Sequence, residues 1–97
     1  MTIIVSGVLH VDPEQRAAFL ESRIPILAHA RDAPGCLDFS LSADLLDPGR
    51  VNVYERWRSH EDLRAYRASE GGPELDESVP VTAADVELHH VSASEPP

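Results

Sequence analysis

The segment that most constrains the fold is a short run that is apolar on both of its faces. Residues 2–10, TIIVSGVLH, are rich in β-branched residues, and apolar side chains stand at both odd and even positions. Successive side chains of a strand point to opposite faces, so this pattern predicts a strand that is covered on both sides. A chain of 97 residues supplies one domain with only a modest core. We therefore expect one α+β domain whose second sheet face is covered by another copy of the chain.

The remaining segments alternate between helical and strand patterns. Asp12 is a good helix cap, and Pro25 lies inside the helical run that follows, where it should kink the helix. The turn Asp47-Pro48-Gly49 between two alternating runs predicts a hairpin. The expected elements are a strand over 2–10, a helix from Pro13 to the stop Ala33-Pro34-Gly35, strands over 36–43 and 51–58, a short helix after Ser59, and a strand over 84–91.

This order, strand–helix–strand–strand–helix–strand, is that of the ferredoxin-like fold. It predicts a four-stranded antiparallel sheet with both helices on one face. The first and third strands should be central neighbours, and we expect that central pair to run parallel. Residues 74–81 have no definite pattern, with room for one helical turn that Pro80 would end. We expect one domain over residues 1–92, followed by a frayed tail over 93–97.

Charge and cysteine content exclude several classes of protein. A formal net charge of −9 argues against nucleic acid partners, whose phosphates require a basic patch, and against anionic membrane surfaces. The single cysteine, Cys36, excludes an internal disulfide and fits a reducing compartment. The N-terminal segment lacks the basic region of a signal peptide, and no apolar run has the length of a membrane span. We therefore expect a soluble, cytoplasmic protein.

The strand over 51–58 carries the most informative polar side chain. Glu55 shares strand parity with Val53 and Trp57, so all three should face the helices. A carboxylate on such a face either lines a cavity or has a charged partner. Partial desolvation would raise its pKa and suit a general base. The alternative is a structural ion pair with a helix arginine such as Arg16, Arg23 or Arg31. Trp57 is either an aromatic wall for a flat substrate or a large core residue.

Other candidate side chains have weaker signals. Tyr66 on the second helix could hydrogen-bond a substrate oxygen or simply pack. His90 shares parity with Leu88 and could reach a cavity or the dimer interface, although a structural histidine is the plainer interpretation. No pair of histidines has metal-ligand spacing, so we expect no metal. Cys36 has no basic neighbour and is interpreted as a small structural residue, not a nucleophile.

Residues 30–69 contain three further motifs: Pro34-Gly35-Cys36-Leu37, Asp47-Pro48-Gly49-Arg50, and Tyr54-Glu55-Arg56-Trp57 leading into Ser59-His60-Glu61-Asp62-Leu63. Together they resemble the antibiotic biosynthesis monooxygenase family, a branch of the dimeric α+β barrel superfamily. With the first strand and helix, the resemblance covers about residues 3–69. It implies a homodimer in which two sheets pack face to face, and a cavity between sheet and helices in each subunit.

The resemblance also implies an activity. Some members of the family oxidise phenolic or anthrone-type polyketides to quinones with molecular oxygen, without metal, haem or flavin. We therefore expect a cofactor-independent monooxygenase acting on a small, electron-rich aromatic compound, with Glu55 and Trp57 as catalytic residues. The expected substrate contacts are Tyr66, Val53 and His90.

The sequence departs from the family's pattern at two places. Val53 stands where the polyketide-oxidising members have an asparagine, and the second helix lacks the histidine of many relatives, which argues against haem. Two alternatives from other functional classes therefore stay open. One is a non-catalytic module that binds a small molecule, and the other is an isomerase or lyase that uses Glu55 for proton transfer in the same cavity.

Overall fold

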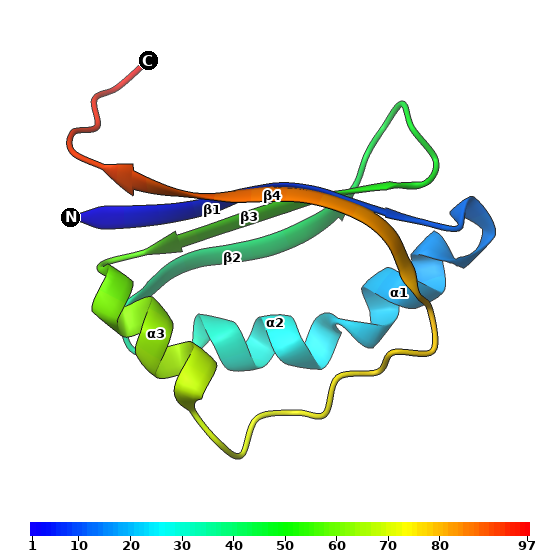
Figure 1. Cartoon of the computed structure of the whole chain (residues 1–97), viewed down its shortest axis with the longest axis horizontal. Coiled ribbons are helices and arrows are strands. Elements are labelled where there is room, and N and C mark those ends of the chain that lie inside the picture. The colour runs from blue at the N-terminus through cyan, green and yellow to red at the C-terminus, as the bar shows by residue number, and fades with distance from the viewer.

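A computed structural model describes all residues, 1–97, and confirms the ferredoxin-like α+β fold. Figure 1 shows the sheet as one layer and the helices as a second layer beneath it. The elements are β1 (Thr2–Val11), the 3-10 helix η1 (Pro13–Gln15), α1 (Arg16–Ser22), α2 (Ile24–Arg31), β2 (Cys36–Ala43), β3 (Arg50–Trp57), α3 (His60–Ala68) and β4 (Val81–Val91).

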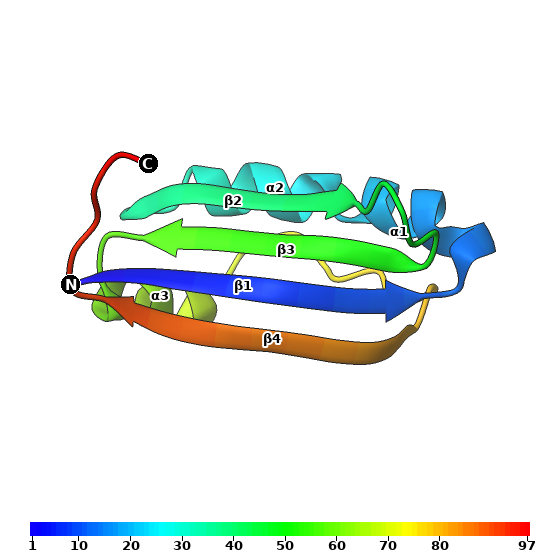
Figure 2. The same ribbon diagram turned by 90° about the horizontal axis from the view of Figure 1, so that it is seen from above.

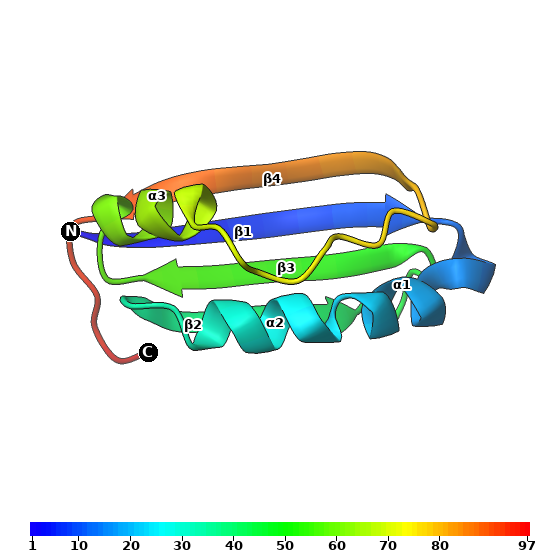
Figure 3. The same ribbon diagram turned by 90° about the horizontal axis from the view of Figure 1, so that it is seen from below.

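The sheet has the strand order β2-β3-β1-β4, and every neighbouring pair is antiparallel. Figure 2 looks onto the face without helices, and Figure 3 onto the face that the helices cover. The expectation that β1 and β3 run parallel was wrong, since Val5 pairs with Glu55 in an antiparallel ladder. The physical reason is the connection. The helical crossover brings β2 back in the direction of β1, and the hairpin then reverses the chain into β3.

The first helical region is divided in two near Pro25. The helix α1 ends at Ser22, and α2 begins at Ile24, with Arg23 as the junction. Proline has no backbone N–H, and its ring clashes with the carbonyl group four residues earlier, here that of Glu21. The predicted kink is therefore confirmed as a break between two short helices.

The start of β2 differs from the predicted alternation. The register against β3 shifts between Cys36, which pairs with Trp57, and Asp38, which pairs with Arg56. Leu37 is the extra residue of this bulge and is 49% exposed, whereas Cys36 packs against the core. Strict alternation back from Phe39 would place Leu37 on the core side and Cys36 on the other. The bulge inserts one residue and so reverses the parity before it.

The helix-facing side of the sheet has two separate apolar clusters. One contains Ile3, Val5, Ala30, Phe39, Trp57 and Leu63, and the other contains Val11, Phe19, Val51 and Val79. Between them lies a row in which Gly7 pairs with Val53 on one side and Val86 on the other. None of these three belongs to a cluster, and Val86 is 37% exposed. The middle of the sheet is therefore packed less completely than its two ends.

The segment between α3 and β4 has no helical turn, so the turn considered for residues 74–81 does not form. Figures 1 and 3 show it running beneath the sheet from the end of α3 to the start of β4. Val79 anchors it in the second cluster, and Arg23 Nη1 donates a 2.6 Å hydrogen bond to the carbonyl oxygen of Asp76. The last strand begins at Val81, three residues before the predicted start at Ala84. No helix combines the length and apolar character needed to cross a membrane.

Candidate active site between the sheet and two helices

Glu55 and Trp57 lie side by side on the helix-facing side of β3. They are two residues apart, so a strand points both toward the helices, as predicted. The indole Nε1–H of Trp57 donates a hydrogen bond to Oε1 of Glu55 over 2.9 Å. Trp57 is fully buried and belongs to the first core cluster, and Glu55 is half-buried. The core position expected as one alternative for Trp57 is therefore observed.

Burial is the largest influence on the Glu55 carboxyl and raises its pKa above the ordinary value for glutamate. The hydrogen bond from Trp57 and the positive charge of Arg67 act in the opposite direction and lower the pKa. The net pKa is raised, so the carboxylate is a stronger proton acceptor than an exposed glutamate. This is the property that a general base requires.

No arginine forms an ion pair with Glu55. The chain has two ion pairs, Arg50 with Asp44 and Arg58 with Asp62, and neither includes Glu55. The three arginines that were considered instead donate to backbone carbonyl groups: Arg16 to Asp44, Asp47 and Arg50, Arg23 to Asp76, and Arg31 to Phe39. The alternative of a structural ion pair at Glu55 is therefore wrong.

The side chain of Tyr66 lies over this pair from α3. Its ring centroid is 5.1 Å from that of Trp57 and 6.3 Å from that of Phe39, which pairs with Glu55 across the sheet. Burial, and next the negative charge of Glu55, raise the pKa of the Tyr66 hydroxyl. The phenol therefore stays neutral and can donate a hydrogen bond to a bound oxygen atom.

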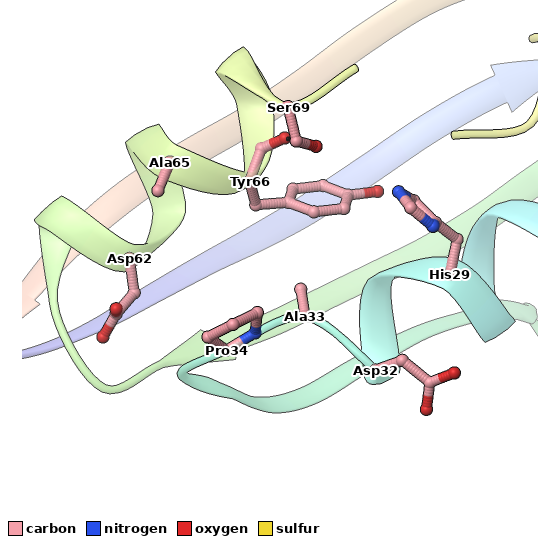
Figure 4. A pocket seen from close by; sticks show the side chains of 8 residues that line it. All are labelled: His29, Asp32, Ala33, Pro34, Asp62, Ala65, Tyr66 and Ser69. Carbon is pink, nitrogen blue, oxygen red and sulfur yellow. Dashed lines mark hydrogen bonds between the residues drawn. The ribbon is translucent and has the colours of Figure 1, made fainter. Parts of the chain in front are cut away.

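A hollow of about 400 Å³ lies between the end of α2 and α3. Figure 4 shows it with Tyr66 on one side and the hydroxyl of Tyr66 directed toward the ring of His29. We call it the main hollow; it is lined by His29, Asp32, Ala33, Pro34, Asp62, Ala65, Tyr66 and Ser69. Neither Glu55 nor Trp57 lines it. Tyr66 both lines the main hollow and packs on Trp57, so it separates the hollow from the carboxylate.

His29 was not among the predicted site residues. Its ring centroid is 5.8 Å from that of Tyr66, and it lines the main hollow. In the sequence, His29 and Arg31 are the polar positions of a mainly apolar helical segment, Ile24–Arg31. Nothing in that spacing indicates that α3 packs beside it, so only the tertiary fold brings His29 and Tyr66 together.

The other predicted residues lie apart from the main hollow. Val53 is half-buried on the helix-facing side of β3, opposite Gly7. His90 lies opposite Ile3 on β4, is exposed, and its ring centroid is 5.5 Å from that of His60. The structure therefore brings Glu55, Trp57 and Tyr66 into one cluster and leaves Val53 and His90 outside it.

Cys36 lies near the same cluster but is poorly suited to be a nucleophile. Burial, followed by the negative charges of Glu55 and Asp38, raises the pKa of its thiol. The residue packs against the first core cluster. No group of three or more histidine, cysteine or acidic side chains is placed to hold a metal ion.

Comparisons with known proteins place this geometry in context. The family model for antibiotic biosynthesis monooxygenases matches residues 2–71. No curated protein matches the chain by sequence. A proposed antibiotic biosynthesis monooxygenase from Deinococcus radiodurans has the same fold, with a TM-score of 0.82 and 22% identity over 97% of this chain and 96% of that one.

Two further solved structures are also similar. SnoaB, a cofactor-independent oxygenase from Streptomyces nogalater, has a TM-score of 0.78 and 15% identity over 99% of this chain and 98% of that one. The heme-degrading protein Rv3592 from Mycobacterium tuberculosis has a TM-score of 0.71 and 18% identity over 99% of this chain and 100% of that one. At these identities the structural likeness establishes the fold alone.

Proposed function

The chain belongs to the antibiotic biosynthesis monooxygenase family, and from this premise we propose that it is a cofactor-independent monooxygenase. Its substrate would be a small, electron-rich aromatic compound, of the quinol or polyketide type, and its oxidant molecular oxygen. The observation that carries the proposal is the half-buried Glu55 carboxyl, which has no ion-pair partner and accepts the N–H of Trp57 beneath Tyr66.

The first step of the proposed reaction is removal of a proton from the substrate. Glu55 is the base, because burial raises its pKa and no cation pairs with it. Trp57 holds one carboxylate oxygen and leaves the second available for the proton. The Tyr66 hydroxyl donates to the oxygen atom on which negative charge develops.

The substrate must pass Tyr66 to reach Glu55. The flat ring enters the main hollow and packs on Tyr66, whose side chain then turns aside. Tyr66 is half-buried at the wall of the main hollow, so this path requires rotation of its side chain. The bound ring thereby replaces Tyr66 as the aromatic neighbour of Trp57. Trp57 then forms the aromatic wall of the substrate site.

The second step transfers electrons from the substrate anion to molecular oxygen. For an anthrone-type substrate, whose reacting carbon is a methylene group, one oxygen atom forms the new carbonyl group of the product. The other oxygen atom leaves as water with the two hydrogens of that methylene group. Four electrons leave the carbon and four reduce the oxygen molecule. The proposed reaction therefore requires no external reductant.

Oxygen uptake by chelator-treated protein, with a panel of quinols and anthrones, tests this proposal. We expect uptake with at least one member of the panel, and a decrease of about a hundredfold or more in Glu55→Gln. Glu21→Gln, an exposed change on α1, is the matched control and should keep the wild-type rate. Absence of uptake across the panel, or an unchanged rate in Glu55→Gln, would contradict the proposal.

The second candidate is a non-catalytic module that binds a small hydrophobic molecule. The observation that favours it is that neither Glu55 nor Trp57 lines the main hollow. Thermal stabilisation by an aromatic ligand, without turnover in air, would support this alternative. Turnover under strict anaerobiosis would instead support the isomerase or lyase.

We also propose that the protein is a homodimer formed through the face of the sheet without helices. The side chains of Ile4, Val8 and Tyr54 lie on that face, which no other element of the chain covers. A second copy would bury these apolar groups. The wild-type protein should sediment as a dimer, and the Val8→Asp variant should sediment as a monomer. A wild-type monomer at micromolar concentration would contradict the proposal.

A further inference from the structure

A second, smaller hollow adjoins the main hollow on the other side of His29 and Tyr66. Its volume is about 180 Å³. His29, Tyr66 and Ser69 line both hollows, and the smaller one is also lined by Ile26, Arg67, Gly72 and Pro73. Gly72 lies so close that a Cβ atom there would be 2.9 Å from Nε2 of His29. One pair of aromatic side chains therefore divides a single site into two compartments.

The two compartments differ in chemistry. The main hollow has small apolar side chains, Ala33, Pro34 and Ala65, and two acidic residues. The smaller hollow has no acidic residue. Its polar side chains are those of Arg67, His29, Tyr66 and Ser69, each of which can donate a hydrogen bond. This lining suits a ligand that carries hydrogen-bond acceptors.

Arg67 has its donors available for a ligand. Its guanidinium forms no ion pair with any side chain of the chain, in contrast to Arg50 and Arg58. Its positive charge acts on Glu55 without forming an ion pair. The planar guanidinium presents several N–H groups whose geometry matches a carboxylate.

We infer that the smaller hollow binds the carboxylate of an aromatic acid whose ring lies against Tyr66 in the main hollow. This assignment rests on the proposed function for the class of ring and adds the anionic group. Arg67 binds the carboxylate, with His29 as a second donor. Together the two hollows fall within the usual volume of a small-molecule site.

Any preference of this protein for an anionic ligand must come from side chains that contact the ligand. The formal net charge of −9 repels anions at long range, and salt screens that repulsion beyond about 8 Å. Any preference for a carboxylate over a neutral group of the same shape therefore reports on the basic side chains that touch it. Arg64, an exposed arginine on the same helix that lines neither hollow, provides a matched control.

Calorimetric titration of the full-length protein with 2-naphthoate and with 2-naphthamide tests this inference. The two probes share a ring and differ in charge. We expect the carboxylate to bind about tenfold tighter or more. Arg67→Gln should reduce that preference to within about twofold while the affinity for the amide stays unchanged, and Arg64→Gln should retain the full preference. Arg67 is exposed, so both variants should remain folded, which circular dichroism can check.

Equal affinity of the wild type for the two probes, including no detectable binding of either, would overturn the inference. So would a preference that survives in Arg67→Gln. The proposed function fails separately. Carboxylate selectivity without oxygen uptake by any aromatic substrate would remove the monooxygenase and leave the ligand assignment. Oxygen uptake with neutral aromatic substrates, without a preference for the carboxylate probe, would remove the ligand assignment and leave the monooxygenase.

Discussion

The indole N–H of Trp57 donates to the carboxylate of Glu55 over 2.9 Å, between two residues of one central strand. Because the two side chains are two residues apart on one face of β3, the backbone itself sets their spacing. The fully buried indole fixes the direction of the half-buried carboxyl. The candidate base is therefore positioned by the core of the protein and not by a mobile loop.

Replacement of Trp57 by phenylalanine should change the pH dependence of activity. The Trp57 hydrogen bond lowers the pKa of Glu55, so its removal should raise that pKa further. The acid limb of the rate profile for oxygen uptake should move to higher pH in Trp57→Phe. Stability should also fall by about 2 kcal/mol, from the lost bond and the smaller side chain. An acid limb that stays in place would show that this hydrogen bond does not tune the base.

Removal of the Tyr66 ring should expose Trp57, the single tryptophan of the chain. Tyr66 packs on the indole with a centroid distance of 5.1 Å. In Tyr66→Ala, tryptophan emission should shift to the red and become accessible to acrylamide, whereas Tyr66→Phe should keep the wild-type spectrum. Unchanged quenching in Tyr66→Ala would show that Tyr66 does not separate the indole from the main hollow.

The raised pKa of Glu55 should make stability depend on pH. The folded state holds the Glu55 proton to higher pH than the unfolded chain, whose pKa is near the ordinary 4.5. The native state thus binds more protons between the two pKa values, and this group's contribution to stability is lost as pH rises through that interval. Urea unfolding from about pH 4 to about pH 8 should show Glu55→Gln gaining stability relative to the wild type. The free energy of unfolding of Glu21→Gln should change with pH in parallel with that of the wild type. A difference between Glu55→Gln and the wild type that does not change with pH would contradict the raised pKa of Glu55.

Gly7 should tolerate no side chain, unlike Gly71. At Gly7 the backbone has φ +155°, and an added Cβ would collide with the carbonyl oxygen of Asp85 in β4. Gly71 also has a positive φ, +85°, but nothing lies within 4 Å of an added Cβ. Gly7→Ala should therefore cost at least about 2 kcal/mol more than Gly71→Ala in chemical unfolding. Similar costs would show that β4 can move away from Gly7.

Periodicity predicts much of this fold because the segments of β2 and β3 alternate over most of their length. The side chains of Glu55 and Trp57 could be placed on one face from their spacing alone. The bulge that turns Cys36 inward could not, because it depends on the register with β3 and not on the composition of β2. The direction of β1 relative to β3 follows from the connections, and the wrong expectation came from neglecting the reversal at the hairpin.

The site was less predictable than the fold. Tyr66 was a candidate, but its position between the main hollow and Glu55 depends on how α3 packs against the sheet. His29 had no local signal, because an isolated histidine in an amphipathic helix is usually structural. Arg67 was not among the predicted site residues. Its place in the proposed ligand site follows only from the tertiary structure, in which Arg67 and His29 line the same small hollow.

The most direct test of the central claim separates proton removal from oxidation. An anthrone is mixed with the protein without oxygen, its anion is followed by absorbance, and oxygen is then admitted. The wild type should form the anion anaerobically and then consume one molecule of oxygen per molecule of substrate. Glu55→Gln should form almost no anion. Anion formation and oxygen consumption at the wild-type rate in Glu55→Gln would contradict the assignment of Glu55 as the base.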